Sequence, residues 1–360
     1  VAGSFYNVTK WSDWLRIYGV ATIVLLYICK FIMLPFLMID DLVRLGRWIG
    51  SLFSPRAPGD PAFSVSRLKF IVYSGLIVSG ILGVNLLYGM FRNAYRYKLH
   101  RVKVAIPNLP EAFVGLKIVQ ISDIHSGSFI RTKPIAEAVE MINGLNPDLI
   151  LFTGDLVNNL ATEIEPFVPI FGKLKARLGS FSVMGNHDYG DYFNWDHIGQ
   201  KHENLRKLHQ AHADMGWKLL LNENAIVEKD GERLAIIGVE NWGAKANFPK
   251  YGDLQKACVG IDTASVKILL SHDPSHWDAQ VRQDRSDIHL TLSGHTHGFQ
   301  FGIEIPGLKW SPSQYVYDKW AGLYKEGLQY LYVNRGFGFL GYPGRVGILP
   351  EITLIELQPA

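Results

Sequence analysis

The sequence predicts an α/β domain that is preceded by two membrane-spanning helices. The helices are predicted from two apolar stretches: residues 17–39 contain Lys30 as their only charged side chain, and residues 70–91 contain none. About 20 such residues are enough to cross a bilayer as a helix. The domain is predicted from the alternation of β-branched apolar runs with amphipathic stretches from Val102 onward, which is typical of α/β folds.

We expect residues 1–103 to form the membrane anchor and residues 104–360 to form the α/β domain. The first apolar stretch is too long for a signal peptide and has no small-residue cleavage site before Arg44. The amphipathic residues 41–53 indicate either a short helix in the membrane interface or an ordinary connecting helix. Residues 54–61 are rich in Pro and predict a turn-rich linker.

Small residues recur every four positions in the second apolar stretch, at Gly75, Ser79 and Gly83. This spacing allows close packing of helices in lipid, so we expect a hairpin with the first helix, and self-association fits equally well. Lys and Arg are slightly more numerous on the side that holds the N-terminus and the domain than in the loop between the helices. The sequence therefore predicts a multi-pass membrane protein with its domain on the cytoplasmic side.

The apolar runs of the domain end in a repeated pattern of Asp, Asn and His, often beside a glycine. The five runs end at Asp123 and His125; at Gly154 and Asp155; at Gly185, Asn186, His187 and Asp188; at His272; and at Gly294, His295, Thr296 and His297. In open α/β sheets, ligands bind at the carboxyl ends of the strands, so we expect these ends to converge. Mixed carboxylate, amide and imidazole groups predict a site for transition metals.

The order of these motifs resembles the signature of the calcineurin-like metallophosphoesterases, over about residues 113–357. Residues 121–127 and 294–300 resemble the membrane-tethered branch of that family in more detail. Phe299 stands where that branch usually has a glycine, and its ring could narrow the mouth of the pocket. The resemblance implies a four-layer α-β-β-α sandwich behind the helical hairpin.

The resemblance also implies a centre of two divalent ions, Mn, Fe or Zn. Asp155 would bridge the ions, with Asp123, His125 and His297 completing one site and Asn186, His272 and His295 completing the other. A hydroxide that bridges the ions would then attack a phosphate ester or a pyrophosphate. His187 would protonate the leaving oxygen while Asp188 orients its imidazole, or His187 would only support Asn186.

Three further residues are candidates for substrate binding. Asn158 either holds the loop of Asp155 or caps the next turn, and Arg335 and Arg345 either bind phosphate or lie in surface turns. We interpret the remaining histidines of the chain as solvated: His100, His197, His202, His209, His212, His276 and His289. Aromatic residues in 191–196 and 310–324 either shape specificity beside the membrane or pack an irregular loop.

We therefore expect a membrane-anchored phosphohydrolase that acts on a phosphorylated, lipid-linked small molecule in contact with membrane lipids. The alternatives are a broad-specificity phosphodiesterase or phosphoprotein phosphatase held at the membrane, and a metal-binding scaffold without catalysis. A net charge of +3 and the absence of a basic tract with interleaved aromatics argue against a nucleic-acid partner. Only Cys29 and Cys258 occur, which excludes a disulfide framework.

Overall fold

The computed structural model describes residues 12, 14–53, 65–245 and 247–360, and it divides into two units, Val1–Phe91 and Arg92–Ala360. The division lies before the boundary expected at residue 103. The reason is strand β1 (Lys98–Ile106), which pairs along its whole length with strand β14 (Glu351–Pro359) at the end of the chain. This pairing makes residues 98–103 part of the α/β domain.

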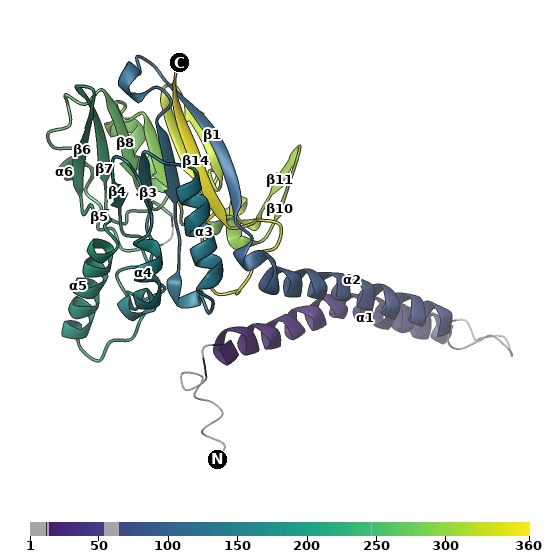
Figure 1. Ribbon diagram of the computed structural model, residues 1–360. Helices are drawn as coiled ribbons and strands as arrows, with labels where there is room; N and C mark the ends of the chain where they lie inside the picture. The colour runs from purple at the N-terminus through teal and green to yellow at the C-terminus, as the bar shows by residue number, and fades with distance from the viewer. Residues whose placement is uncertain (1–11, 13, 54–64, 246) are drawn as a thin grey trace. The chain divides into compact units, whose positions relative to one another are not determined.

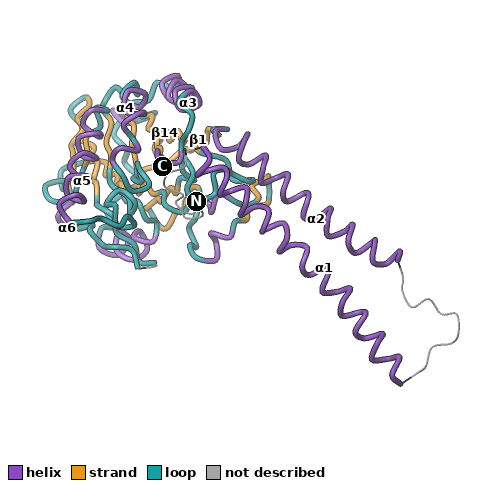
Figure 2. Tube along the Cα trace, turned by 90° about the horizontal axis from the view of Figure 1, so that it is seen from below, coloured by secondary structure: helices purple, strands orange, loops and turns teal. Residues whose placement is uncertain are grey.

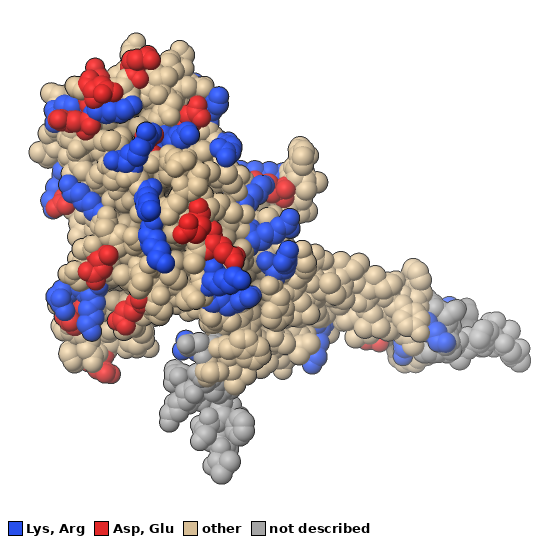
Figure 3. Space-filling model, in the orientation of Figure 1, with Lys and Arg blue, Asp and Glu red and all other residues tan. Residues whose placement is uncertain are grey.

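The first unit is a pair of long helices, α1 (Val20–Phe53) and α2 (Val65–Phe91), with a short π-helical turn at Leu15–Gly19. Both helices are long and apolar enough to cross a membrane, and only 6% and 22% of their most apolar windows are buried. Such low burial is unlike the core helix of a soluble domain. Figure 3 shows few charged residues along most of the visible length of the two helices.

The small residues of α2 face α1, and the two helices lie side by side (Figure 2). A Cβ atom added to Gly75 would lie 2.7 Å from Met33 Sδ, and one added to Gly83 would lie 3.2 Å from Cys29 Sγ. Close packing at this spacing requires small residues. The predicted hairpin is confirmed, whereas self-association stays a prediction.

The amphipathic residues 41–53 do not form a separate helix. Helix α1 continues through them without a break and contains Pro35 in its interior. Within this extension the Arg44 Nε atom donates a hydrogen bond of 2.6 Å to Asp40 Oδ2, one turn away. The predicted linker at residues 54–61 lies outside the described residues.

The second unit contains two six-stranded sheets (Figure 1). The first has the order β1-β14-β2-β3-β4-β5, and the second has the order β12-β13-β9-β8-β7-β6. The remaining strands of the first sheet are β2 (Lys117–Ile121), β3 (Leu149–Phe152), β4 (Ser180–Ser182) and β5 (Lys218–Leu219). Those of the second are β6 (Glu223–Lys229), β7 (Glu232–Gly238), β8 (Val266–Leu270), β9 (Leu290–Ser293), β12 (Gly322–Glu326) and β13 (Gln329–Val333).

Three buried apolar clusters show how the layers pack. One cluster lies between the two sheets, with residues such as Ile118, Leu151 and Ile268. A second lies between the first sheet and helices α3 (Lys133–Gly144), α4 (Val168–Phe171) and α5 (Ile198–Asp214). The third lies between the second sheet, the short helix α6 (Leu254–Ala257) and the π-helical turn at Trp277–Val281, which leads into α7 (Arg282–Asp284). The predicted four-layer sandwich is confirmed.

The topology brings the five motif-bearing strand ends to one edge. Strands β2, β3 and β4 run parallel in the first sheet, and β8 and β9 run parallel in the second. The two sheets are joined there by a hydrogen bond of 2.9 Å from Gln120 Nε2 to the carbonyl oxygen of Ser293. After β9 the chain forms a small separate hairpin of β10 (Ile303–Ile305) and β11 (Leu308–Trp310).

Two histidines that we expected to be solvated are buried. His212 Nδ1 lies 3.0 Å from Ser182 Oγ, and burial lowers the pKa of His212 to about 3. The two ring nitrogens of His276 lie 2.8 Å from Ser271 Oγ and 2.9 Å from Gln280 Oε1. The interpretation of both as surface residues is wrong, because each imidazole has polar partners inside the fold.

Candidate metal centre

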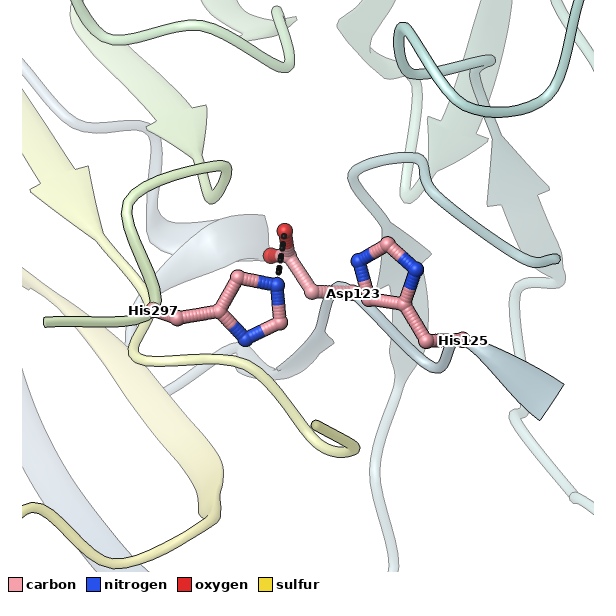
Figure 4. Close-up of side chains that lie close together, drawn as sticks. All are labelled: Asp123, His125 and His297. Atoms are coloured by element: carbon pink, nitrogen blue, oxygen red, sulfur yellow. Dashed lines mark ion pairs between the residues drawn. The ribbon is translucent and has the colours of Figure 1, made fainter. Parts of the chain in front are cut away.

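The first group of potential ligands consists of Asp123, His125 and His297, and their ligand atoms lie within 4.8 Å of one another. Figure 4 shows the three side chains turned toward one another. His297 Nε2 lies 3.3 Å from Asp123 Oδ1. The Nε2 atoms of His125 and His297 are buried and have no hydrogen-bond partner in the described part of the chain. Buried ring nitrogens beside a carboxylate are what a bound cation would satisfy.

The second group consists of Asp155, His272 and His295, whose ligand atoms also lie within 4.8 Å of one another. Asn186 joins this group, because its Oδ1 atom lies 2.9 Å from His295 Nδ1. Asp155 Oδ2 lies 3.1 Å from His272 Nε2 and 3.5 Å from His125 Nε2. One carboxylate oxygen therefore lies between the two groups, where a bridging ligand is needed.

The backbone at this edge is strained. Asp123, His125, Asp155, His295 and His297 all have positive φ values, between 48° and 69°. Non-glycine residues rarely adopt this left-handed conformation, and it concentrates at functional sites. The fold therefore maintains an unfavourable backbone in order to direct these side chains inward.

Two glycines allow the carboxylates to approach the backbone. A Cβ atom on Gly185 would lie 2.2 Å from Asp155 Oδ1, and one on Gly294 would lie 2.1 Å from Asp123 Oδ2. The backbone N–H groups of His187 and His295 donate to the same carboxylates, at 2.9 Å from Asp155 Oδ1 and Asp123 Oδ1. These contacts explain why glycine precedes both motifs.

Hydrogen bonds orient two of the imidazoles. His272 Nδ1 donates to the carbonyl oxygen of Thr153 at 2.8 Å, and His125 Nδ1 lies 3.1 Å from Asn158 Oδ1. With hydrogen on Nδ1, each ring directs Nε2, the atom that can bind a metal, toward Asp155. Partners of this kind are usual for metal-binding histidines, because they select the tautomer that can bind.

The protonation states also fit a cation site. Burial lowers the pKa of His125 to about 3 and that of His297 well below its ordinary value, so both rings are neutral and can bind a metal. Burial also lowers the pKa of His272, but Asp155 outweighs it, and the pKa rises to about 10. Without an ion, the proton on His272 balances the charge of the Asp155 carboxylate, and a bound divalent ion would take over that role. We conclude that the residues fit two divalent ions.

The structure contradicts the role expected for Asp188. Its carboxylate is fully buried and accepts hydrogen bonds from four backbone N–H groups, those of Asp155, Leu156, Val157 and Gly185. The His187 imidazole is held instead by the carbonyl oxygen of Asn158, to which its Nδ1 donates at 2.9 Å. Asp188 therefore holds the loop that carries Asp155, and the orientation of His187 comes from the backbone.

The substrate-binding candidates are engaged within the protein. Asn158 contacts His125 through Oδ1 and donates through Nδ2 to Ser128 Oγ at 3.2 Å. Arg335 is 3% exposed and donates to Glu351 Oε2 at 2.6 Å and to Glu304. Asn158 therefore supports a potential ligand, and Arg335 is neither a surface residue nor free to bind phosphate.

Arg345 is fully buried and donates to backbone carbonyl oxygens, including that of Arg335 at 2.6 Å and that of Gly336 at 3.2 Å. Its Nη2 atom also lies 3.2 Å from His297 Nδ1. Binding of an ion at His297 Nε2 would put hydrogen on Nδ1, so Nη2 would then donate to the carbonyl oxygens alone. Both roles expected for Arg345, phosphate binding and a surface turn, are wrong for this buried side chain.

Sequence reasoning did not single out three residues beside the centre. Tyr317 Oη lies 2.9 Å from His295 Nε2, and Asp273 Oδ2 lies 3.7 Å from the same atom. Tyr192 Oη accepts from Asn186 Nδ2 at 3.0 Å, which directs the amide oxygen of Asn186 toward His295. Tyr192 and Tyr317 lie in the two aromatic stretches noted above, whereas no local pattern marks Asp273.

Comparison with known proteins agrees with this geometry. Residues 116–299 match the family described as calcineurin-like phosphoesterase, and residues 1–94 match a family described as probable calcineurin-like phosphoesterase, transmembrane domain. A transmembrane protein with metallophosphoesterase domain from Danio rerio is 32% identical over 321 residues, 87% of this chain and 68% of that protein. The uncharacterized metallophosphoesterase YkuE of Bacillus subtilis is 30% identical over 304 residues, 82% of this chain and 98% of that protein. An uncharacterized metallophosphoesterase of Campylobacter jejuni is 30% identical over 301 residues, 81% of this chain and 71% of that protein. The chain therefore belongs to the calcineurin-like phosphoesterases, a family of metal-dependent hydrolases, and it carries the transmembrane domain of its membrane-associated members.

Proposed function

We propose that the protein hydrolyses phosphate ester or pyrophosphate bonds of a lipid-linked substrate, with a centre of two Mn, Fe or Zn ions. The observation that supports this most is the position of Asp155 Oδ2 between two histidine-containing groups, 3.5 Å from His125 Nε2 and 3.1 Å from His272 Nε2. Four imidazoles in the set favour these metals over Mg²⁺ and Ca²⁺, which prefer oxygen ligands.

Two ions bound there would supply Lewis acidity, which polarises phosphoryl oxygens and lowers the pKa of a bound water. The protein itself would position the ligands and supply a proton. The His187 ring lies 5.0 Å from the His125 ring and 4.8 Å from that of Tyr192, which places an acid beside the centre. Its hydrogen bond to the Asn158 carbonyl holds the ring in position to transfer a proton to the leaving oxygen.

The lipid-linked substrate is supported by the membrane-associated helices of the chain. An enzyme tethered to a bilayer meets substrates in that bilayer at a high effective concentration. We also propose that both helices span the membrane and that the α/β domain faces the cytoplasm, as the distribution of Lys and Arg favours. An engineered cysteine near Ala244 would then resist an impermeant thiol reagent in intact cells, and ready labelling would reverse this topology.

The decisive test compares Asp155→Asn with a matched control, Asp148→Asn. Asp148 precedes the same strand, β3, at its opposite end, and its Oδ2 accepts from the Lys117 backbone N–H at 2.8 Å. We expect Asp155→Asn to lose bound metal and nearly all hydrolysis, and Asp148→Asn to keep both. The substrates are a phosphomonoester, a phosphodiester and a lipid pyrophosphate presented in detergent micelles.

Each outcome separates the candidate functions. Full metal content and normal turnover in Asp155→Asn would refute the two-metal assignment. Turnover of soluble esters without turnover of the lipid pyrophosphate would favour a broad-specificity enzyme held at the membrane. Stoichiometric metal without turnover of any substrate would favour the scaffold.

A further inference from the structure

The hairpin of β10 and β11 has one apolar face and one polar face. Its cross-strand pairs are Ile303 with Trp310, Glu304 with Lys309, and Ile305 with Leu308. Because side chains alternate along a strand and paired residues share a face, the first and third pairs lie on one face and the charged pair lies on the other.

The charged face is turned toward the domain. Glu304 forms ion pairs with Arg335 and with Lys98, the latter at 3.8 Å. Lys309 Nζ donates to the carbonyl oxygen of Ala321 and lies 4.6 Å from the centre of the Trp320 ring. The hairpin is therefore held in a defined orientation by four contacts on its polar side.

The apolar face is left open. Ile303, Ile305 and Leu308 are 44%, 59% and 48% exposed, and Tyr315, whose hydroxyl lies 3.4 Å from Trp310 Nε1, is 76% exposed. In Figure 1 the hairpin projects from the body of the second unit beside the start of β1. Exposed isoleucine and leucine side chains on a projecting hairpin, beside a half-buried Trp310 and an exposed tyrosine, are typical of an interaction surface.

The covalent chain brings this hairpin close to the bilayer. Lys98, which pairs with Glu304, follows Phe91 at the end of α2 by seven positions. Seven residues reach at most about 25 Å even when fully extended. Because α2 is a candidate membrane span, Lys98, which pairs with the hairpin, is tethered within that distance of the end of the span.

The charges around the hairpin suit lipid headgroups. A cavity of about 430 Å³ beside it is lined by Arg96 and Lys98 as well as Glu304, and the acid is already paired with Arg335. Arg101 and Lys103 are also exposed on the same edge strand, β1. Basic residues close to a membrane helix are attracted to anionic lipid, and Trp and Tyr favour the interface.

We propose that the β10–β11 hairpin is a membrane-docking element that inserts its apolar face into the leaflet from which α2 emerges. The hairpin lies in the chain between His297, a potential ligand, and Tyr317, which contacts His295. Phe299, two residues after His297, is also exposed, at 61%. Docking therefore presents the metal centre to phosphates at the membrane surface. This consequence for the substrate rests on the proposed function, whereas docking itself does not.

The test uses the full chain with Cys29 and Cys258 replaced by alanine, reconstituted into nanodiscs of phosphatidylcholine and phosphatidylglycerol. A single cysteine replaces Leu308 and carries an environment-sensitive fluorophore. The matched control replaces Leu328, which is 64% exposed at the turn of another hairpin, that of β12 and β13. Because β13 runs parallel to β9, that turn lies at the sheet edge opposite the metal centre.

We expect doxyl-labelled lipids to quench the fluorophore at Leu308 and aqueous iodide to quench the one at Leu328. Equal iodide quenching at both positions would overturn the proposal. Shielding of Leu308 from both iodide and doxyl lipid would also overturn it, because that result indicates a protein partner. The quenching result requires no enzymatic activity.

The substitution Ile305→Asp in the otherwise unchanged chain tests the consequence for catalysis. Insertion of one such aliphatic side chain into the bilayer favours the membrane-docked state over the undocked state by roughly 10- to 100-fold. We therefore expect Ile305→Asp to lower kcat/KM for a lipid pyrophosphate by a factor within that range. Hydrolysis of a soluble aryl phosphate should stay unchanged. An equal fall for both substrates would refute the presentation of lipid phosphate. If the unsubstituted chain hydrolyses none of the substrates, the proposed function is refuted, whereas the quenching result still tests docking.

Discussion

Replacing Asn158 with alanine should weaken metal binding without touching a ligand. Asn158 Oδ1 is the partner of His125 Nδ1 at 3.1 Å, inside a site where His125 itself is fully buried. Without that acceptor the Nδ1–H group is buried and unpaired, or the ring changes tautomer and places hydrogen on Nε2. Leaving such a group unpaired costs about 1 to 3 kcal/mol. The expected loss of metal affinity is therefore about 10- to 100-fold, as for other partners of metal ligands.

The chain offers a conservative variant and a neighbouring control. Asn158→Asp keeps an acceptor for His125, loses the donor to Ser128 and adds a negative charge that favours a cation, so its metal affinity should not fall below that of the unchanged chain. Asn159→Ala removes a side chain whose buried Oδ1 has no hydrogen-bond partner among the described residues. The backbone N–H groups of both asparagines keep their hydrogen bonds to Glu163 in all three variants.

The assay is competition for the metal by a chelator of known affinity, followed by turnover of an aryl phosphate at saturating metal. If Asn158 supports His125, Asn158→Ala needs more metal for half-maximal occupancy but recovers kcat and KM at saturation. A raised KM with unchanged metal affinity would refute this reasoning, because it would show that Asn158 binds the substrate.

Three further predictions follow from the same contacts. His187→Ala should retain metal and lose about 10² to 10⁴-fold in rate on an alkyl phosphate ester, while an activated aryl ester, which leaves without a proton, is spared; equal losses on both esters would exclude a role as general acid. Asp188→Asn replaces a carboxylate that accepts from four N–H groups with an amide that accepts through one oxygen, so two charge-assisted hydrogen bonds are lost at about 1.5 to 3 kcal/mol each. The melting temperature of this variant in detergent should therefore be lower than that of the unchanged chain, and an equal melting temperature would contradict the role of Asp188. Burial raises the pKa of Glu351, but Arg335 outweighs it and lowers the pKa to about 2 from its ordinary 4.5, a difference worth about 3 kcal/mol. Because the folded-state pKa is depressed, this stabilisation is present above pH 4.5 and is lost as the pH falls toward 2. The melting temperatures of the unchanged chain and of Glu351→Gln should therefore converge as the pH falls through that window. A constant difference between the two melting temperatures would refute the pairing of Glu351 with Arg335.

The sequence alone was sufficient for the architecture and for the potential ligands, because both depend on local patterns. Long apolar stretches must become buried or membrane-spanning helices whatever surrounds them. Residues at the carboxyl ends of neighbouring parallel strands meet at one edge of a sheet. Asp123 and His295 are 172 residues apart, and yet each could be placed at that edge from its own strand.

The roles of the supporting residues were decided only by the tertiary structure. Arg335 is an isolated arginine in a glycine-rich stretch, and what excludes it from phosphate binding is Glu351, a partner that local sequence does not reveal. Asp188 was assigned to its neighbour His187, but its N–H donors come mainly from the loop after β3, about thirty residues earlier.

The apolar face of the β10–β11 hairpin also could not be identified from the pattern alone. Ile303, Ile305 and Leu308 would be as well suited to a core as to a membrane surface. The ion pair between Glu304 and Arg335 decides which face is buried, because a charged pair with partners inside the domain leaves the apolar side chains outside. Local sequence determines which groups a segment carries, whereas burial and hydrogen bonding depend on partners brought together only by folding.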